Sequence, residues 1–278
     1  MKNSTIEYQK KLVLASFSQT IAKTEMDNLF QQAYHNSINL MFGYEGLVRF
    51  LNEGGAKGRS SIEVVMHLAS IKELLPNLEE YCENYDIDLS LDSTLDPTPE
   101  IYKAFININI YYLNYNIGTI CTNGNVWPEI YTGFREFRDT LESHNVDFGI
   151  ISSGYEKFIR EVFNYHSIKQ PLLYITPDDS FGPYNLDWKS KNKPSVYLIA
   201  LAIDQWLQYN PQIDMDYARQ NVILIGDDIE PDGKMAENAG IPFWFFNQDT
   251  NIVLNNNQRI FSNYGQLTNA LKDGKLFY

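Results

Sequence analysis

Short apolar runs alternate with amphipathic stretches over much of the chain. Four runs are bounded by turn residues and have the length and composition of buried parallel strands. They cover residues 11–15, 148–152, 222–226 and 242–246, and a weaker run covers 172–175. Apolar residues recur at helical spacing in 156–163 and 195–208. This alternation predicts an α/β fold with a doubly wound parallel sheet.

The pattern changes after the first predicted strand. Apolar residues there recur at helical spacing, in segments joined by polar turns. The segments are 25–33, 47–51, 62–74, 78–84 and 100–113. We therefore expect an α/β core made of residues 8–22 and 128–278. A mainly helical domain of residues 23–127 is expected as one insertion after the first strand.

Charge and hydropathy exclude several classes of partner. The net charge is −13 and the sequence pI is about 4.7, whereas nucleic acids and anionic membranes attract basic surfaces. No apolar run reaches the roughly 18 residues that predict a membrane span, and the run 12–17 is too short for a signal peptide. Cys82 and Cys121 lack metal-ligand spacing and indicate free thiols in a reducing compartment. We expect a cytoplasmic protein, with delivery by a signal-independent secretion route as an open alternative.

Polar residues follow three of the predicted strands. Ligands of doubly wound sheets gather at the carboxyl ends of the strands, where the winding order reverses. Residues 16–20, 152–154 and 227–232 follow such ends. The last segment holds Asp227, Asp228 and Asp232, and carboxylates that converge on one point suit Mg²⁺. The alternative is that Asp227 and Asp228 cap the helix that follows.

Together these segments resemble the haloacid-dehalogenase-like superfamily of phosphatases. The acidic run 226–241 resembles the fourth motif of that family, and 131–159 looks most like its phosphoserine-phosphatase branch. The Lys-Pro-Ser-Val run at 193–196 is similar to the methionine-salvage phosphatases of the same branch. The resemblance covers residues 8–22 and 128–247. It implies that the helical insertion is a cap domain, which closes over the site and selects the substrate.

The resemblance also implies a phosphate cradle. Ser152 matches the residue that hydrogen-bonds the phosphoryl group, and a following helix adds backbone donors and a favourable dipole. Lys193 matches the lysine that neutralises phosphate, although a plain surface lysine is the alternative. The implied phosphate-binding residues are Thr20, Ser152, Ser153, Gly154 and Lys193.

The first motif departs from the family pattern, which reads apolar-Asp-apolar-Asp-Gly-Thr. Ser16 and Ser18 stand at the two aspartate positions, and Gln19 replaces the glycine. In the family the first aspartate attacks phosphorus and binds Mg²⁺, and the second serves as acid and base. A serine hydroxyl is a poor nucleophile without a neighbouring base, and it is no general acid near neutral pH. We expect degenerate catalytic positions and, at Asp227, Asp228 and Asp232, a weak magnesium site at most.

One basic segment of the insertion invites a phosphate-loop interpretation. Lys57 and Arg59 lie in the glycine-rich stretch 52–61, but its spacing does not match a phosphate loop and no strand precedes it. As part of a cap these two residues would contact an anionic substrate. The alternative is a turn between helices.

Three functions remain open on the sequence alone. The first is a pseudophosphatase that binds a phosphorylated small molecule or a protein partner without efficient turnover. The second is an active Mg²⁺-dependent phosphomonoester hydrolase or phosphotransferase, in which Ser16, Asp227 or Asp228 takes over part of the chemistry. The third is a protein-interaction module whose inserted domain is the working surface.

Overall fold

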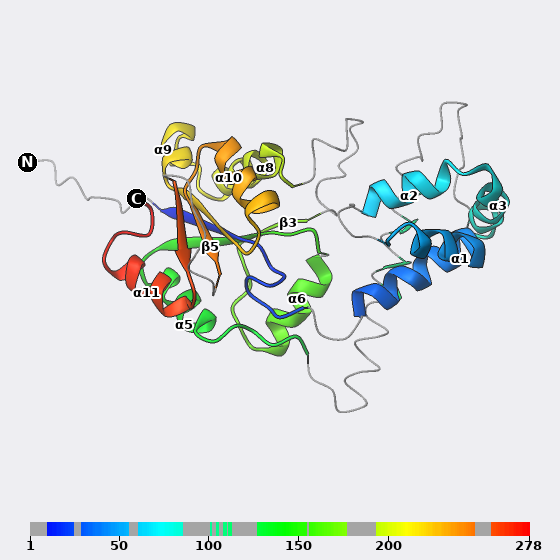
Figure 1. Ribbon diagram of the computed structural model, residues 1–278. Helices are drawn as coiled ribbons and strands as arrows, with labels where there is room; N and C mark the ends of the chain where they lie inside the picture. Colours follow the sequence, from blue (N-terminus) through cyan, green and yellow to red (C-terminus); the bar gives the residue numbers. More distant parts are fainter. Residues whose placement is uncertain are drawn as a thin grey trace, which may run out of the picture. The chain divides into compact units, whose positions relative to one another are not determined.

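The protein divides into two compact units, shown in the computed structural model of Figure 1. Residues Met1–Glu25 and Pro128–Tyr278 form the core unit, and Met26–Trp127 form the inserted unit. The structure describes residues 10–24, 29–55, 61–85, 127–154, 156–176, 193–247 and 257–278, together with 101, 104–105, 108–109 and 111–112. Within these residues no helix is long and apolar enough to cross a membrane.

A parallel sheet forms the centre of the core unit. In the described residues its strand order is β3-β2-β1-β4-β5-β6, and every neighbouring pair is parallel. The strands are β1 (Lys11–Ala15), β2 (Val146–Ile151), β3 (Leu173–Ile175), β4 (Val222–Gly226), β5 (Phe243–Phe246) and β6 (Gln258–Phe261). The chain builds outward from β1 to β3 and then returns to β4 on the other side of β1, so the winding order reverses between β1 and β4. The predicted doubly wound α/β fold is confirmed.

Helices cover both faces of the sheet, as Figure 1 shows. One face carries α8 (Val196–Tyr209), α9 (Met215–Gln220) and α10 (Lys234–Ala239). The other carries α5 (Phe134–Ser143), α6 (Glu156–Tyr165) and α11 (Tyr264–Lys272). Leu12 and Leu14 pack in one buried cluster with Trp206 of α8, whereas the rings of Phe134 and Phe148 lie 5.8 Å apart on the other side. Covering both faces explains why the inner strands are mostly apolar.

The inserted unit is helical in the residues that the structure describes. It contains α1 (Leu29–Asn52), α2 (Ser61–Ala69), the 3₁₀ helix η2 (Lys72–Leu74) and α3 (Leu75–Asn84). Its described residues between 101 and 112 are helical as well. Cys82 of α3 is a buried free cysteine, and burial raises the pKa of its thiol to about 11. Cys121 lies outside the described residues.

The helices expected at 25–33 and 47–51 fall, in their described residues, within one element, α1, whose two helical parts meet at a kink. Gly43 lies at the kink with φ 70° and ψ 179°, a backbone conformation that residues other than glycine rarely adopt. The kink interrupts the helical hydrogen bonds, and Asn77 of α3 donates its side-chain N–H to the Phe42 carbonyl at 3.0 Å. Buried Ile38 and Met41 continue the apolar face through the segment that the sequence pattern left unassigned.

Candidate functional site

The carboxyl ends of β1, β2 and β4 bring the predicted site segments together. Ala15 of β1 pairs with Ile150 of β2 and with Ile225 of β4. Because neighbouring strands lie about 4.8 Å apart, Ser16 comes next to the ends of both neighbours. Ser152 follows β2 directly, and both serines are 7% exposed.

Ser16, Lys193 and Asp232 form a connected buried group. The Lys193 ammonium donates to Ser16 Oγ at 3.0 Å and to Asp232 Oδ1 at 2.6 Å. The side chains of Lys193 and Asp232 are only 8% and 2% exposed. Asp232 lies over Gly226 at the end of β4, where an added Cβ would come within 2.4 Å of Asp232 Oδ2. Glycine at 226 is therefore what allows the carboxylate to reach the lysine.

The lysine reaches this group from the start of α8. Ser195 caps the helix by accepting a hydrogen bond from the Tyr197 backbone N–H at 3.2 Å. Pro194 stands between the lysine and the cap, and the Lys193–Pro194 peptide bond is cis. Lys193 is thus a buried, ion-paired residue at the sheet edge, and the alternative of a plain surface lysine is wrong.

Thr20 and Asp227 form a second pair at the same edge. The Thr20 hydroxyl donates to Asp227 Oδ1 at 2.6 Å, and Thr20 is completely buried. Burial raises the pKa of the Asp227 carboxyl, and nearby Asp232 raises it further, while the Thr20 hydrogen bond and Lys193 act in the opposite direction. Desolvation prevails, and the neutral carboxyl is favoured relative to an exposed aspartate.

Tyr264 of α11 supports this pair and could not be predicted from the sequence. Its hydroxyl donates to the Thr20 carbonyl at 2.8 Å, across 244 residues of sequence. Burial raises the pKa of the phenol well above its usual value, so the group stays a hydrogen-bond donor. An aromatic residue in an amphipathic helix gives no local signal for such a role.

Replacing Tyr264 by phenylalanine is expected to lower the free energy of unfolding by about 1–3 kcal/mol, because the buried Thr20 carbonyl loses its donor. Denaturant unfolding monitored by tryptophan fluorescence measures the change. Tyr209, which is 63% exposed in α8, supplies the matched control. Tyr209→Phe is expected to stay within about 0.5 kcal/mol of the wild type. Equal effects of the two changes would contradict the assigned contact.

Replacing Asp227 by asparagine is expected to stabilise the protein in a pH-dependent way. The folded-state pKa of Asp227 is raised above its usual value of 3.8, so its protonated form favours folding and that contribution is lost as pH rises through the folded pKa. Asparagine stays neutral and keeps an oxygen that accepts from Thr20. Thermal unfolding from acid to neutral pH is expected to show a gain at neutral pH that disappears below the usual pKa. A gain of equal size at every pH would contradict the raised pKa.

The serine-glycine turn after β2 is held by its own hydrogen bonds. The Gly154 backbone N–H donates to Ser152 Oγ at 2.9 Å, and the Ser152 backbone N–H donates to the Ile175 carbonyl at 3.0 Å. Ser153 is exposed, and α6 begins two residues after Gly154. The turn therefore leads into a helix N-terminus at the edge where Ser16 lies.

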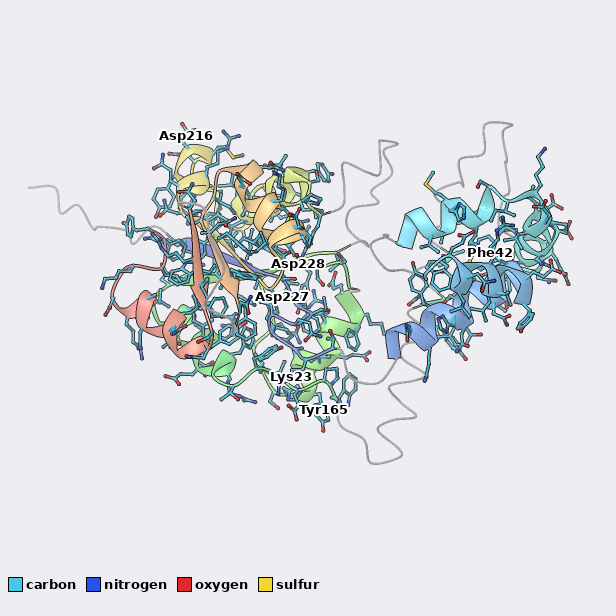
Figure 2. The ribbon with its side chains drawn as sticks, viewed as in Figure 1. Lys23, Phe42, Tyr165, Asp216, Asp227 and Asp228 are labelled. Carbon is cyan, nitrogen blue, oxygen red and sulfur yellow. The ribbon has the colours of Figure 1, made fainter. Side chains whose placement is uncertain are left out.

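Asp228 has a structural contact that the alternative interpretation anticipated. Its carboxylate accepts from the Glu230 backbone N–H at 3.0 Å and caps the π-helical turn η4 (Ile229–Gly233). Figure 2 labels Asp227 and Asp228, which follow β4 directly in the chain. The two neighbouring aspartates thus differ in their contacts, since Asp227 accepts from Thr20.

Position 19 of the first motif has a left-handed backbone conformation although it holds glutamine in place of glycine. Gln19 has φ 56°, and its side chain donates to Thr24 Oγ1 at 3.2 Å. Ser18 is half-buried and forms an isolated parallel bridge with Ala22. The described contacts do not join Ser18 to the Ser16–Lys193–Asp232 group. Lys57 and Arg59 lie outside the described residues.

The described residues do not present the donor set of a magnesium site. Among them no group of three or more His, Cys, Asp or Glu side chains is arranged to hold a metal ion. Asp232 is paired with Lys193, Asp228 caps a turn and Asp227 accepts from Thr20. Mg²⁺ demands near-octahedral oxygen ligands from one or two carboxylates plus waters or phosphate. As arranged in the wild type, these residues do not fit the ion, and no step proposed below for the wild type passes through it.

Comparison with known proteins gives a likeness in structure alone. The sequence matches no family model and no curated protein. A haloacid dehalogenase-like hydrolase from Bacteroides fragilis superposes with a TM-score of 0.53 at 16% identity, over 93% of this chain and 100% of that one. A 2-haloacid dehalogenase from Pseudomonas syringae pv. Tomato DC3000 superposes with a TM-score of 0.52 at 13% identity, over 96% of this chain and 100% of that one.

The fold is haloacid-dehalogenase-like. At such low identity the likeness establishes the haloacid-dehalogenase-like fold and carries no assignment of chemistry. The roles of Ser16, Thr20 and Lys193 therefore rest on their contacts in this chain.

Proposed function

We propose that the protein is a pseudophosphatase of the phosphoserine-phosphatase-like branch, which binds a phosphorylated small molecule or protein partner without efficient turnover. The observation that carries the proposal is the 3.0 Å contact between Lys193 Nζ and Ser16 Oγ. The family resemblance assigns a carboxylate nucleophile to position 16, and here the lysine faces a neutral hydroxyl. The cation that would neutralise phosphate is kept, and the group that would attack phosphorus is missing.

Anion binding at this edge is supported by the groups around Ser16. The hydroxyls of Ser16 and Ser152 follow adjacent strands, and α6 begins just beyond the Ser152 turn. A helix N-terminus carries roughly half a positive charge and unpaired backbone N–H donors. Serine in place of aspartate at positions 16 and 18 also removes two negative charges that would repel a phosphate. We propose that Thr20, Ser152, Ser153, Gly154 and Lys193 form the cradle.

Nucleophilic catalysis by Ser16 lacks a base. A serine needs an adjacent proton acceptor, and Lys193 is held by the Asp232 carboxylate at 2.6 Å. The histidines of the core unit bond elsewhere, His144 to the Thr140 carbonyl and His166 to the Pro128 carbonyl. With no free base described beside the hydroxyl, slow or absent turnover is the expectation.

One observation favours a second candidate, an active hydrolase or phosphotransferase. The 3.0 Å approach of Lys193 Nζ to Ser16 Oγ has the geometry of a serine–lysine pair, which other hydrolases use for nucleophilic attack. Such a reaction needs the neutral amine, and it would be favoured if the ligand drew Asp232 away from the lysine. A phosphatase activity that stays with the protein through purification and is absent from Ser16→Ala would establish this candidate in place of the first.

Calorimetric titration with inorganic phosphate in the presence of EDTA tests the cradle. Wild type and Ser16→Ala are expected to bind phosphate saturably, because neither carries a charge at position 16. Ser16→Asp is expected to bind at least about tenfold more weakly, since two unit charges 4 Å apart repel by about 4 kcal/mol at an effective dielectric constant of 20. Equal affinity of Ser16→Asp and Ser16→Ala, or no saturable binding, would contradict the proposal.

We propose that magnesium binds at most weakly at Asp227, Asp228 and Asp232. Each of these carboxylates already has a partner in the chain, so the ion would have to compete for it. Mg²⁺ is expected to raise the unfolding midpoint of the wild type little, and to raise that of a Ser16→Asp variant more. A large shift in the wild type would contradict the weak-site proposal.

A further inference from the structure

A cavity of about 470 Å³ lies at the other edge of the sheet, by the amino end of β2. We call it the Arg138 cavity. Its lining includes Lys10, Arg138, Glu142, Asp147, Phe148 and Leu172. Cavities that hold small organic ligands have volumes of about 300–1,000 Å³. None of the proposed phosphate-cradle residues lines it.

Arg138 of α5 is the unusual member of this lining. It is only 5% exposed, and Nη2 donates to the Gln170 carbonyl at 3.3 Å. Its Nε has no hydrogen-bond partner, and no carboxylate forms an ion pair with it in the part of the chain that the structure describes. The Phe148 ring lies 5.3 Å from the guanidinium carbon and gives partial compensation. A charge buried this deeply is normally paired.

The acids that line the cavity are already matched by other cations. Glu142 pairs with Lys169, and Asp147 pairs with Lys10 at 3.1 Å. Asp147 also accepts from Trp206 Nε1 at 2.8 Å. Each carboxylate of the lining thus has a lysine partner, and Arg138 forms no ion pair among the described residues, although Glu142, Asp139 and Asp147 lie near enough to raise its pKa. Burial is nevertheless the largest influence on the guanidinium and lowers its pKa.

We propose that the Arg138 cavity binds a small monocarboxylate with an apolar body. The carboxylate supplies the single negative charge that Arg138 lacks, and charge-assisted hydrogen bonds to a guanidinium are strong and directional. Phe148, Pro171 and Leu172 supply apolar wall for the rest of the ligand. Arg138 is the one cation of the lining without an ion-pair partner. A dianion such as a phosphomonoester would therefore keep one uncompensated charge, so this site differs in ligand from the strand-end cradle.

The test compares benzoate with benzamide, which has nearly the same shape without the charge. Calorimetric titrations of the full chain use saturating inorganic phosphate, so that the strand-end cradle is occupied. Benzoate is expected to bind saturably and benzamide to bind far more weakly. Arg138→Met is expected to weaken benzoate binding by about thirtyfold or more, the usual effect of removing one partner of a buried charge pair.

A second variant keeps the test decisive if Arg138→Met fails to fold. Leu172 lines the cavity and is 36% exposed, so Leu172→Trp fills the space from a position that tolerates a larger side chain. Leu172→Trp is expected to abolish benzoate binding and leave phosphate binding unchanged. Equal binding of benzoate and benzamide, unchanged benzoate binding in a folded Arg138→Met or Leu172→Trp variant, or no saturable benzoate binding would overturn the proposal. Unchanged binding would mean that Arg138 only ties α5 to the Gln170 loop.

Discussion

Replacing Ser16 and Ser18 together by aspartate is expected to give the protein a phosphomonoesterase activity well above that of the wild type. Lys193 Nζ already lies 3.0 Å from Ser16 Oγ, so a carboxylate at position 16 would be paired and held at the end of β1. An aspartate at position 18 would restore the acid and base that the resemblance implies, and such a group contributes typically about 10²–10⁴-fold. Release of inorganic phosphate from a panel of phosphomonoesters, measured with Mg²⁺, tests the gain.

The matched control for this Ser16→Asp, Ser18→Asp variant, here called the aspartate pair, is Ser16→Asn with Ser18→Asn. Its side chains have the same size and lack the charge. It is expected to stay inactive, and EDTA is expected to abolish the activity of the aspartate pair. Adding Asp227→Asn to the aspartate pair should also lower the activity, because the proposed metal site loses a carboxylate. A folded aspartate pair without any gain would mean that more than the first motif has been lost.

Replacing Lys193 by methionine is expected to lower the free energy of unfolding by about 3–5 kcal/mol, since removing one partner of a buried ion pair leaves the other charge uncompensated. The side chains of Lys193 and Asp232 are 8% and 2% exposed. Water therefore cannot solvate the Asp232 carboxylate well once the lysine is removed. Urea unfolding of the purified variants measures the change. Lys234→Met is the control, because Lys234 is 55% exposed and lies 3.9 Å from Glu237; its effect is expected within about 0.5 kcal/mol.

A double-mutant cycle with Asp232→Asn separates the ion pair from the packing of the lysine stem. With Asp232 neutral, Lys193→Met removes a charge that no longer has a full partner. The cost of Lys193→Met is therefore expected to fall clearly in the Asp232→Asn background. An unchanged cost would show that the pair contributes nothing beyond packing.

The strands could be predicted where both faces of the sheet are covered. β1 and β4 have the predicted bounds, because burial on both faces demands a continuous apolar run. β6 was missed because it lies at the sheet edge and includes the exposed Arg259. The kink at Gly43 was missed as well, since a glycine within a helical pattern indicates a helix end as readily as a bend.

The location of the site could be predicted from the ends of the strands and from the order of the motifs. The topology places Ser16 and Asp227 at one edge, and the contacts of Lys193 fit that placement. Contacts between residues far apart in the sequence leave no local pattern from which they could be predicted. The hydrogen bond from the Tyr264 hydroxyl of α11 to the Thr20 carbonyl is such a contact. Arg138 occupies a position in α5 that an amphipathic pattern assigns to a surface cation. Its burial depends on the loop before β3, which the sequence does not locate.

Phosphorus-31 NMR of the wild type with phenyl phosphate and Mg²⁺ tests whether the protein binds a phosphomonoester without hydrolysing it, because one sample reports both binding and turnover. We expect the ester signal to broaden or shift saturably with protein concentration, and we expect no inorganic phosphate signal to grow. Steady growth of the inorganic phosphate signal, lost in Ser16→Ala, would contradict the proposal, as would an ester signal that the protein leaves unchanged.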